Sequence, residues 1–143
     1  MDIQPGMTAR APFVVDDAGR KTSLVDKHVI ILAVEGGQAY CMYTGTDDGE
    51  HLRRLPGYAS IPSQANAEAG WKLSGRFYAD AGKVCRIPSR LLQVEGRVGN
   101  RLFAQLSDRV SKVCRGTTEY DASIEERSTG HARRMKNGAF VRR

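Results

Sequence analysis

The chain has 143 residues, 41% of them hydrophobic and 27% charged, which excludes a wholly disordered chain, a collagen and a coiled-coil rod. Its net charge of +6 is unevenly spread, because residues 1–48 contain four Lys or Arg against seven Asp or Glu, and residues 49–116 twelve against five. The longest wholly apolar run, residues 29–34, is too short for a membrane span of about 20 residues, so we expect a cytoplasmic protein that does not enter a membrane.

The first predicted strand follows a turn signal at Pro5 and Gly6. Residues 7–15 carry apolar side chains at alternate positions, the pattern of a half-buried strand. Residues 16–27 are polar, contain turn-forming Asp and Gly, and show no regular period. We therefore predict a loop there, and a structureless loop of that length is often functional.

The clearest predicted element is a hairpin. Residues 29–34 are apolar on both faces, which is typical of a central strand, and residues 39–44 return after a turn at Gly36 and Gly37. In a tight hairpin centred on these glycines, residues whose numbers sum to about 72 face each other. His28 should therefore lie opposite Thr44.

The next segment is less regular. We expect a turn at residues 45–50 and a loop over 51–70 that holds one short edge strand near residues 58–61. Residues 71–78 and 84–87 have strand patterns, and the turn signal Ala81-Gly82 between them predicts a second hairpin.

The last predicted element is a helix. Short apolar pieces at residues 91–94 and 98–102 lead to residues 107–114, where Ser107 is a suitable N-cap and Gly116 a stop signal. The apolar stripe continues backwards, so the helix can also begin earlier, near Asn100.

These elements predict a mainly β fold with minor α, a small, strongly bent antiparallel sheet or barrel over residues 1–116. Residues 117–143 have few apolar side chains, and from residue 127 onward they include six basic residues and no acidic one. We expect a polar basic tail, with a short helix or a nucleic-acid arm as the alternatives.

The basic middle of the chain indicates a charged face that attracts polyanions, and this favours nucleic acid as a partner. An ordinary solvated surface is the alternative. The expected sources of the charge are Arg53, Arg54, Arg76, Lys83, Arg86, Arg90, Arg97 and Arg101.

Known catalytic and metal-binding motifs do not occur in the sequence. It has no G-x-S-x-G elbow, no Gly-rich phosphate loop, no H-E-x-x-H pair and no dinucleotide fingerprint. The three histidines, at positions 28, 51 and 131, are far apart, and the three cysteines form no C-x-x-C pair. We therefore expect no metal and no cofactor, and we interpret the cysteines as reduced core residues.

Three polar side chains at the hairpin have groups that can take part in catalysis. Lys27 and His28 precede the central strand, and Thr44 ends its partner. A cation steadies charge on a phosphodiester, a hydroxyl donates a hydrogen bond and an imidazole moves a proton. The alternative is a solvated strand edge, and because Lys27 and His28 are neighbours in a strand, they should point to opposite faces.

Four features occur in a fixed order along the chain. They are Pro5-Gly6 before the first strand, Asp17-Ala18-Gly19-Arg20-Lys21 in the loop, Lys27-His28-Val29-Ile30-Ile31-Leu32, and Cys41-Met42-Tyr43-Thr44. With the later Val84-Cys85-Arg86-Ile87 and the terminal helix, this layout resembles the MazF/PemK endoribonuclease toxins of bacterial toxin–antitoxin pairs over roughly residues 3–115. One departure is that Lys27-His28 stands where the family has Arg-Pro, and lysine lacks the bidentate grip of a guanidinium on phosphate.

The resemblance implies an SH3-like barrel, a homodimer, an antitoxin partner and metal-independent cleavage of single-stranded RNA by the ribose 2′-OH. It places Lys27 and Thr44 at the phosphate, while His28 as the proton-moving group is our own addition. Basic residues expected to guide the RNA are Arg20, Lys21, Arg53, Arg54, Arg76 and Arg86.

Two other functions remain open from the sequence. The same barrel could bind nucleic acid or a protein partner through its basic face without catalysis, and the missing Arg-Pro favours this alternative. The chain could also be a structural or inhibitory protein whose arginine surface meets an acidic partner.

Overall fold

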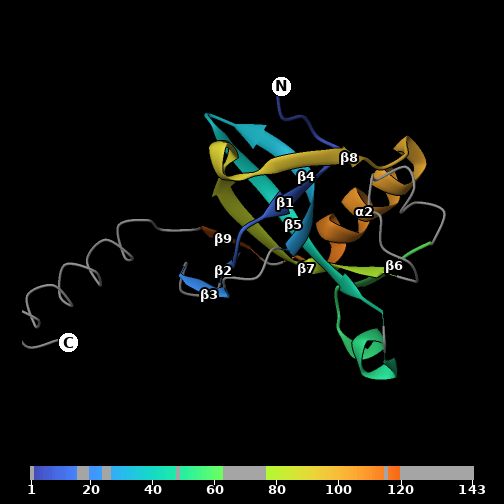
Figure 1. Ribbon diagram of the computed structural model, residues 1–143. Helices are drawn as coiled ribbons and strands as arrows, with labels where there is room; N and C mark the ends of the chain where they lie inside the picture. Colours follow the sequence, from blue (N-terminus) through green and yellow to red (C-terminus); the bar gives the residue numbers. More distant parts are fainter. Residues whose placement is uncertain are drawn as a thin grey trace, which may run out of the picture.

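The computed structural model describes residues 2–15, 20–23, 27–47, 49–62, 77–114 and 116–119. The fold is mainly β with one long helix near its C-terminal end (Figure 1). The strands are β1 (Met7–Ala11), β2 (Val14–Val15), β3 (Lys21–Ser23), β4 (Lys27–Glu35), β5 (Gln38–Thr46), β6 (Tyr58–Ile61), β7 (Phe77–Pro88), β8 (Gln93–Arg97) and β9 (Thr117–Glu119). The helices are η1 (Glu50–Arg54), η2 (Ser89–Leu91) and α2 (Asn100–Val113).

The main sheet is antiparallel along the order β6-β7-β5-β4-β1-β8. Strand β9 joins it parallel to β7, and β2 and β3 form a separate two-stranded sheet. Among the described strands, β6 and β8 are the two ends of this order and do not pair, so the main sheet is open. Figure 1 shows the sheet strongly twisted, with α2 against one side and η1 projecting beyond the end of β5.

The predicted first hairpin is confirmed. Gly36 and Gly37 have φ values of 55° and 78°, the left-handed region that glycine adopts without strain. Pairs such as Val29–Tyr43 and Ile31–Cys41 follow the predicted register, and a bulge between Ile31 and Ala33 shifts it by one residue nearer the turn.

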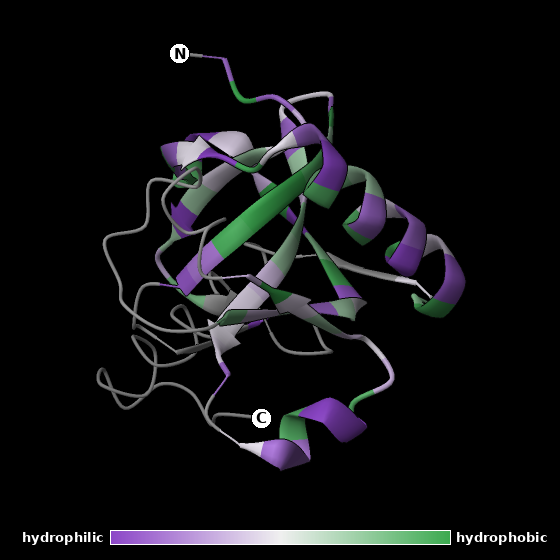
Figure 2. Ribbon diagram, turned by 90° about the vertical axis from the view of Figure 1, so that its right-hand side faces the viewer, coloured by the Kyte–Doolittle hydropathy of each residue, from purple (hydrophilic) through white to green (hydrophobic). Residues whose placement is uncertain are grey.

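The two faces of the sheet bury separate apolar layers, because side chains alternate along each strand. One layer contains Val29, Ile31, Cys41 and Cys85. The other contains Ile30 and Met42, and partly buried side chains of α2 pack against it. Figure 2 shows hydrophobic and hydrophilic residues alternating around α2, as expected for a helix with one face on a sheet. Burial of a side chain such as Ile30 stabilises the fold by about 1.5–3 kcal/mol.

The predicted second hairpin is wrong. Residues 77–88 form one strand, β7, and the Ala81-Gly82 signal marks an irregularity inside it. Between the pairs Met42–Val84 and Thr44–Ala79, β7 has four residues where β5 has one. Residues 71–76, the first part of the expected hairpin, lie outside the described residues.

Other boundaries differ from the predictions in smaller ways. The first strand is divided at Pro12, which has no backbone N–H to donate to a ladder, and β3 occupies part of the expected loop. The helix takes its earlier predicted start, at Asn100. Thr117–Glu119, the first residues of the expected tail, pair with β7, whereas residues 120–143 lie outside the described residues.

Candidate active site

The hairpin brings His28 and Thr44 together, as its predicted register requires. The pairing of β4 with β5 ends at Val29–Tyr43, and one residue beyond it the Thr44 hydroxyl donates a hydrogen bond to the His28 carbonyl oxygen, 2.8 Å away. The Thr44 side chain is only 7% exposed. Its hydroxyl hydrogen is therefore engaged with the backbone, and Thr44 holds the start of β4 in place instead of facing an open cleft.

Lys27 does not join Thr44. It begins β4 opposite Ala11 of β1, and alternation places its side chain on the face of Val29, whereas Thr44 and His28 share the face of Ile30. The expected opposition of Lys27 and His28 thus agrees with the strand geometry, and the ammonium and hydroxyl expected to act together lie on different faces of the sheet.

The structure joins His28 to two side chains that the sequence interpretation did not include. The Nδ1 atom of His28 lies 2.6 Å from a carboxylate oxygen of Glu95 on β8, and Arg10 Nη2 on β1 lies 3.5 Å from the other oxygen. Arg10 pairs directly with His28 across β1 and β4. We call Arg10, His28 and Glu95 the polar cluster.

Glu95 reaches His28 because β8 bulges at this residue. Thr8 pairs with Gly96 and Ala9 with Val94, so Glu95 is an extra residue with no partner position on β1. A bulge of this kind turns a side chain out of the regular alternation. No local sequence signal pointed to Glu95, since it lies 67 residues from His28; the only hint for Arg10 was its polar position in a strand with alternating apolar residues.

The polar cluster has the arrangement of a proton-transfer group. When the Glu95 carboxylate is ionised it only accepts hydrogen bonds, and the proton in this contact then belongs to Nδ1 of His28. The His28 side chain is 25% exposed, Glu95 13% and Arg10 44%. A partly exposed imidazole oriented by a largely buried carboxylate and flanked by a guanidinium can take a proton beside an anionic substrate.

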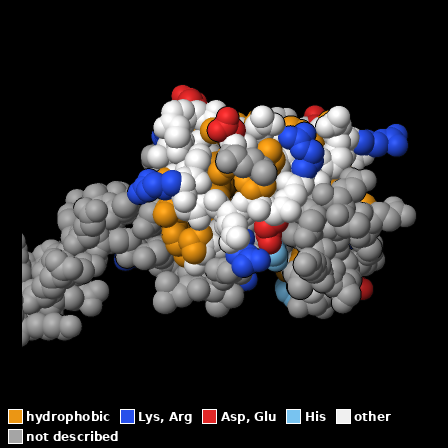
Figure 3. All heavy atoms as spheres, turned by 45° about the horizontal axis from the view of Figure 1, so that its top comes forward, with side chains coloured by type: hydrophobic (Ala, Val, Ile, Leu, Met, Phe, Trp, Pro, Cys, Tyr) orange, Lys and Arg blue, Asp and Glu red, His pale blue; other side chains and the backbone are white. Residues whose placement is uncertain are grey.

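The predicted guiding residues are spread over several elements. Arg20 is exposed, Arg53 and Arg54 are exposed on η1, and the Arg86 guanidinium lies 5.7 Å from the centre of the Tyr40 ring. Arg76 and the side chain of Lys21 lie outside what the structure describes. On the described part of the face in Figure 3, Lys and Arg side chains are scattered and form no continuous patch, and one of them lies beside acidic and histidine side chains.

The described residues contain no group of three His, Cys, Asp or Glu side chains arranged to hold a metal ion. Cys41 and Cys85 face each other across β5 and β7, both buried. Burial, and then the neighbouring Cys85 thiol, raise the pKa of Cys41 to about 12. Cys41 is therefore a protonated core thiol at neutral pH and a poor nucleophile.

Comparison with known proteins found no family model and no curated protein that matches the chain. Within the described ranges, no helix is both long enough and apolar enough to cross a membrane.

Proposed function

We propose that this protein is a metal-independent endoribonuclease that cleaves single-stranded RNA, with the polar cluster as its active site. The single observation that carries the proposal is the 2.6 Å contact between His28 Nδ1 and Glu95, beside Arg10, where the His28 side chain is 25% exposed near the start of β4. A carboxylate that fixes an imidazole, next to a cation, suits a reaction in which a hydroxyl must lose its proton near a phosphate.

The reaction is a transesterification. His28 Nε2 takes the proton of the ribose 2′-OH, whose oxygen then forms a bond to the adjacent phosphorus as the bond to the 5′-oxygen breaks. Arg10 stabilises the charge that develops on the phosphoryl oxygens. The 5′-oxygen takes a proton from solvent, and the products are a 2′,3′-cyclic phosphate and a 5′-hydroxyl. Glu95 holds the ring in the required tautomer and stabilises the imidazolium.

The proposal assigns Thr44 and Lys27 different roles from those that the family resemblance implies. Thr44 is a positioning residue, because its hydroxyl holds the backbone of His28. Lys27, on the other face of β4, contributes charge to the surface instead of touching the scissile phosphate.

The proposal also includes an SH3-like fold, a homodimer and an antitoxin partner in the cytoplasm. Its support is the twisted antiparallel sheet followed by one long helix, in the order that the resemblance to MazF/PemK toxins implies.

The test is cleavage of end-labelled single-stranded RNA in the presence of a chelator by the full chain and its His28→Ala variant. We expect cyclic phosphate ends with the wild type and a rate lower by about a hundredfold or more in the variant. The substitution spares the backbone carbonyl that Thr44 binds. Intact RNA after long incubation with the wild type would refute the proposal.

A second candidate function is nucleic-acid binding without catalysis. Two observations favour it, namely the engagement of the Thr44 hydroxyl with the backbone and the position of Lys27 on the opposite face. In that case RNA remains intact, while its affinity for the protein falls steeply as salt is raised.

A further inference from the structure

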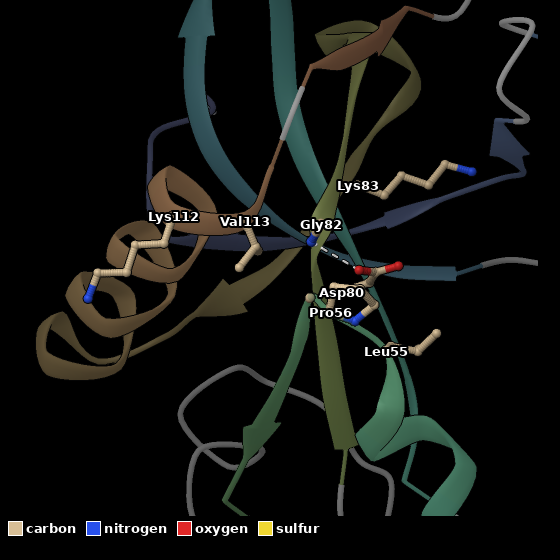
Figure 4. A pocket seen from close by; sticks show the side chains of 8 residues that line it. Leu55, Pro56, Asp80, Gly82, Lys83, Lys112 and Val113 are labelled. Atoms are coloured by element: carbon tan, nitrogen blue, oxygen red, sulfur yellow. Dashed lines mark hydrogen bonds between the residues drawn. The ribbon is translucent and has the colours of Figure 1, made fainter.

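A hollow of about 490 Å³ lies at the C-terminal end of α2, apart from the polar cluster. Its walls come from the turn after η1, from the irregular part of β7 and from the last residues of α2 (Figure 4). The volume falls within the range of small-molecule sites, roughly 300–1,000 Å³. The lining residues are Leu55, Pro56, Gly57, Asp80, Gly82, Lys83, Lys112 and Val113.

The floor of the hollow is backbone, because two glycines meet there. A Cβ atom on Gly57 would lie 2.1 Å from the Gly82 nitrogen, so the two chain segments touch without side chains between them. The Ala81 N–H donates to the Gly57 carbonyl at 2.8 Å, and an Arg109 guanidinium N–H donates to the Pro56 carbonyl at 2.9 Å. These contacts fix the walls, so the hollow is preformed.

One carboxylate of the hollow has a defined orientation. Asp80 Oδ1 accepts the Gly82 N–H at 3.0 Å, and Figure 4 shows the other carboxylate oxygen directed away from Gly82, toward the side of Lys83 and Leu55. An ionised carboxylate accepts hydrogen bonds only. A ligand at this wall must therefore offer N–H or O–H donors.

The remaining walls combine apolar surface with positive charge. Leu55 is 38% exposed, one of two large hydrophobic side chains exposed to that extent among the described residues. Pro56 and Val113 add apolar surface, whereas Lys83 and Lys112 stand at opposite ends of the hollow in Figure 4. The Lys112 ammonium lies 2.9 Å from Asp108, and both of these side chains are about two-thirds exposed, so this pair is weak and exchangeable.

We propose that this hollow binds a guanine nucleotide, with the base edge on Asp80, the base plane on Leu55 and Pro56, and the phosphate near Lys83. Guanine presents two adjacent donors, N1–H and the 2-amino group, which one carboxylate can accept together, with Asp80 Oδ1 accepting the Gly82 N–H as well. Uracil has one ring N–H between two carbonyl oxygens, which a carboxylate repels. Adenine and cytosine each place an acceptor next to their amino group.

This inference rests on the proposed function, because RNA is chosen as the source of the guanine nucleotide on the ground that the protein cleaves RNA. Thr44 pairs with Ala79, the residue before Asp80, so the Ala79 backbone lies two strand spacings, about 10 Å, from the His28 backbone across the sheet. RNA that extends from the polar cluster across β5 to β7 would place a neighbouring guanosine at the hollow.

The first test measures binding of GMP and UMP to the full chain and to Asp80→Asn. We expect GMP to bind the wild type at least about tenfold more tightly than UMP, and the variant to lose this preference. The asparagine amide in this variant keeps an oxygen for the Gly82 N–H and replaces the second carboxylate oxygen by a donor. Equal affinities of the wild type for the two nucleotides, or an unchanged preference in the variant, would overturn the proposal.

A second pair of variants tests the phosphate. Lys83→Met should weaken GMP binding severalfold and leave guanosine binding almost unchanged, because only GMP carries the negative charge. Arg90→Met removes one positive charge from an exposed site outside the hollow and should change neither affinity. Equal losses in both variants would indicate a general charge effect and contradict a built site.

Short oligouridines with and without one internal guanosine separate RNA from a free nucleotide as the source. Their sugars carry 2′-O-methyl groups, so that the 2′-oxygen cannot attack the phosphate and the strands cannot be cleaved. Tighter binding of the guanosine-containing strand, lost in Asp80→Asn, supports a subsite for RNA, whereas GMP binding without this difference contradicts RNA as the source. Guanine binding by a protein that leaves RNA intact would refute only the ribonuclease proposal.

Discussion

Glu95 orients the imidazole ring of His28, because its carboxylate lies 2.6 Å from the ring nitrogen Nδ1. The Glu95 side chain is itself only 13% exposed. Its own position depends on the bulge in β8. In the proposed reaction this side chain acts through His28, so its removal should affect the chemical step more than RNA binding.

We predict that Glu95→Gln lowers kcat for RNA cleavage about tenfold or more and leaves KM nearly unchanged, because the ring loses the carboxylate that stabilises its protonated form. Lys27→Ala is the control, since Lys27 lies on the other face of β4 and should retain most of the wild-type kcat. Equal loss of kcat in the two variants would contradict the assignment of the polar cluster.

Cys41 allows a prediction about alkaline stability. Its pKa is about 12 in the folded protein and 9.0 for a free thiol, so the unfolded chain loses this proton first. The contribution is fully present below pH 9 and is lost as the pH rises toward 12, with a slope of up to about 1.4 kcal/mol per pH unit.

Urea unfolding at a series of pH values measures this slope. Cys41→Ala should show a shallower decline of the free energy of unfolding above pH 9 than the wild type, whatever its stability at neutral pH. Identical slopes for the wild type and Cys41→Ala would show that the buried thiol is not the group that titrates.

Sequence reasoning found His28 and Thr44 because both belong to one hairpin, where residue numbers alone define which positions meet. It missed Arg10 and Glu95 for a physical reason. Their contact with His28 depends on pairing between strands distant in the sequence and on a one-residue bulge, neither of which has a local pattern. The face of Lys27 followed from strand alternation, which requires only that residue 27 belongs to β4.

At the scale of elements, the contact between the turn after η1 and β7 leaves very little space for side chains. The Gly57 and Gly82 backbones approach so closely that a Cβ on Gly57 would also lie 2.7 Å from the Gly82 Cα, whereas a Cβ on Gly82 would meet its nearest neighbour, Asp80 Oδ1, at 3.3 Å. Gly57 and Gly82 take part in the same backbone contact, but an added Cβ would meet backbone atoms at Gly57 and, at Gly82, first the end of a side chain.

We predict that Gly57→Ala lowers the free energy of unfolding by about 3 kcal/mol or more, because backbone atoms cannot move aside as a flexible side chain can. Gly82→Ala should cost about 1 kcal/mol or less, since its closest contact is the end of a side chain. Chemical denaturation of both variants checks the difference, and equal stabilities would mean that the close approach does not exist in solution.

The same contact explains why the second hairpin is not formed. Ala81-Gly82 has the composition of a turn, and its neighbours on each side have strand patterns, so the local pattern favours a hairpin. Inside a strand, however, glycine also marks a bulge or a close approach of another backbone segment. Gly57 supplies that approach, and its position beside Gly82 cannot be deduced from either segment alone.

At the scale of the whole molecule, the mainly β fold and the terminal helix were predictable from apolar periodicity and turn residues. The open order of the sheet was not, because it depends on which distant strands pair. The two apolar layers, one on each face, explain why β4 is apolar at consecutive positions such as Ile30 and Ile31. The polar cluster lies where β4 begins, before this buried run.

Chemical rescue of the full-length His28→Ala variant tests the central claim most directly, since free imidazole can replace a missing imidazole at a partly exposed site. We predict that cleavage by the variant is slow and rises with added imidazole, above the rate for RNA with imidazole alone, and still yields cyclic phosphate ends. Wild-type rates in the variant, or no response to imidazole beyond the protein-free rate, would contradict the assignment of His28 as the group that moves the proton.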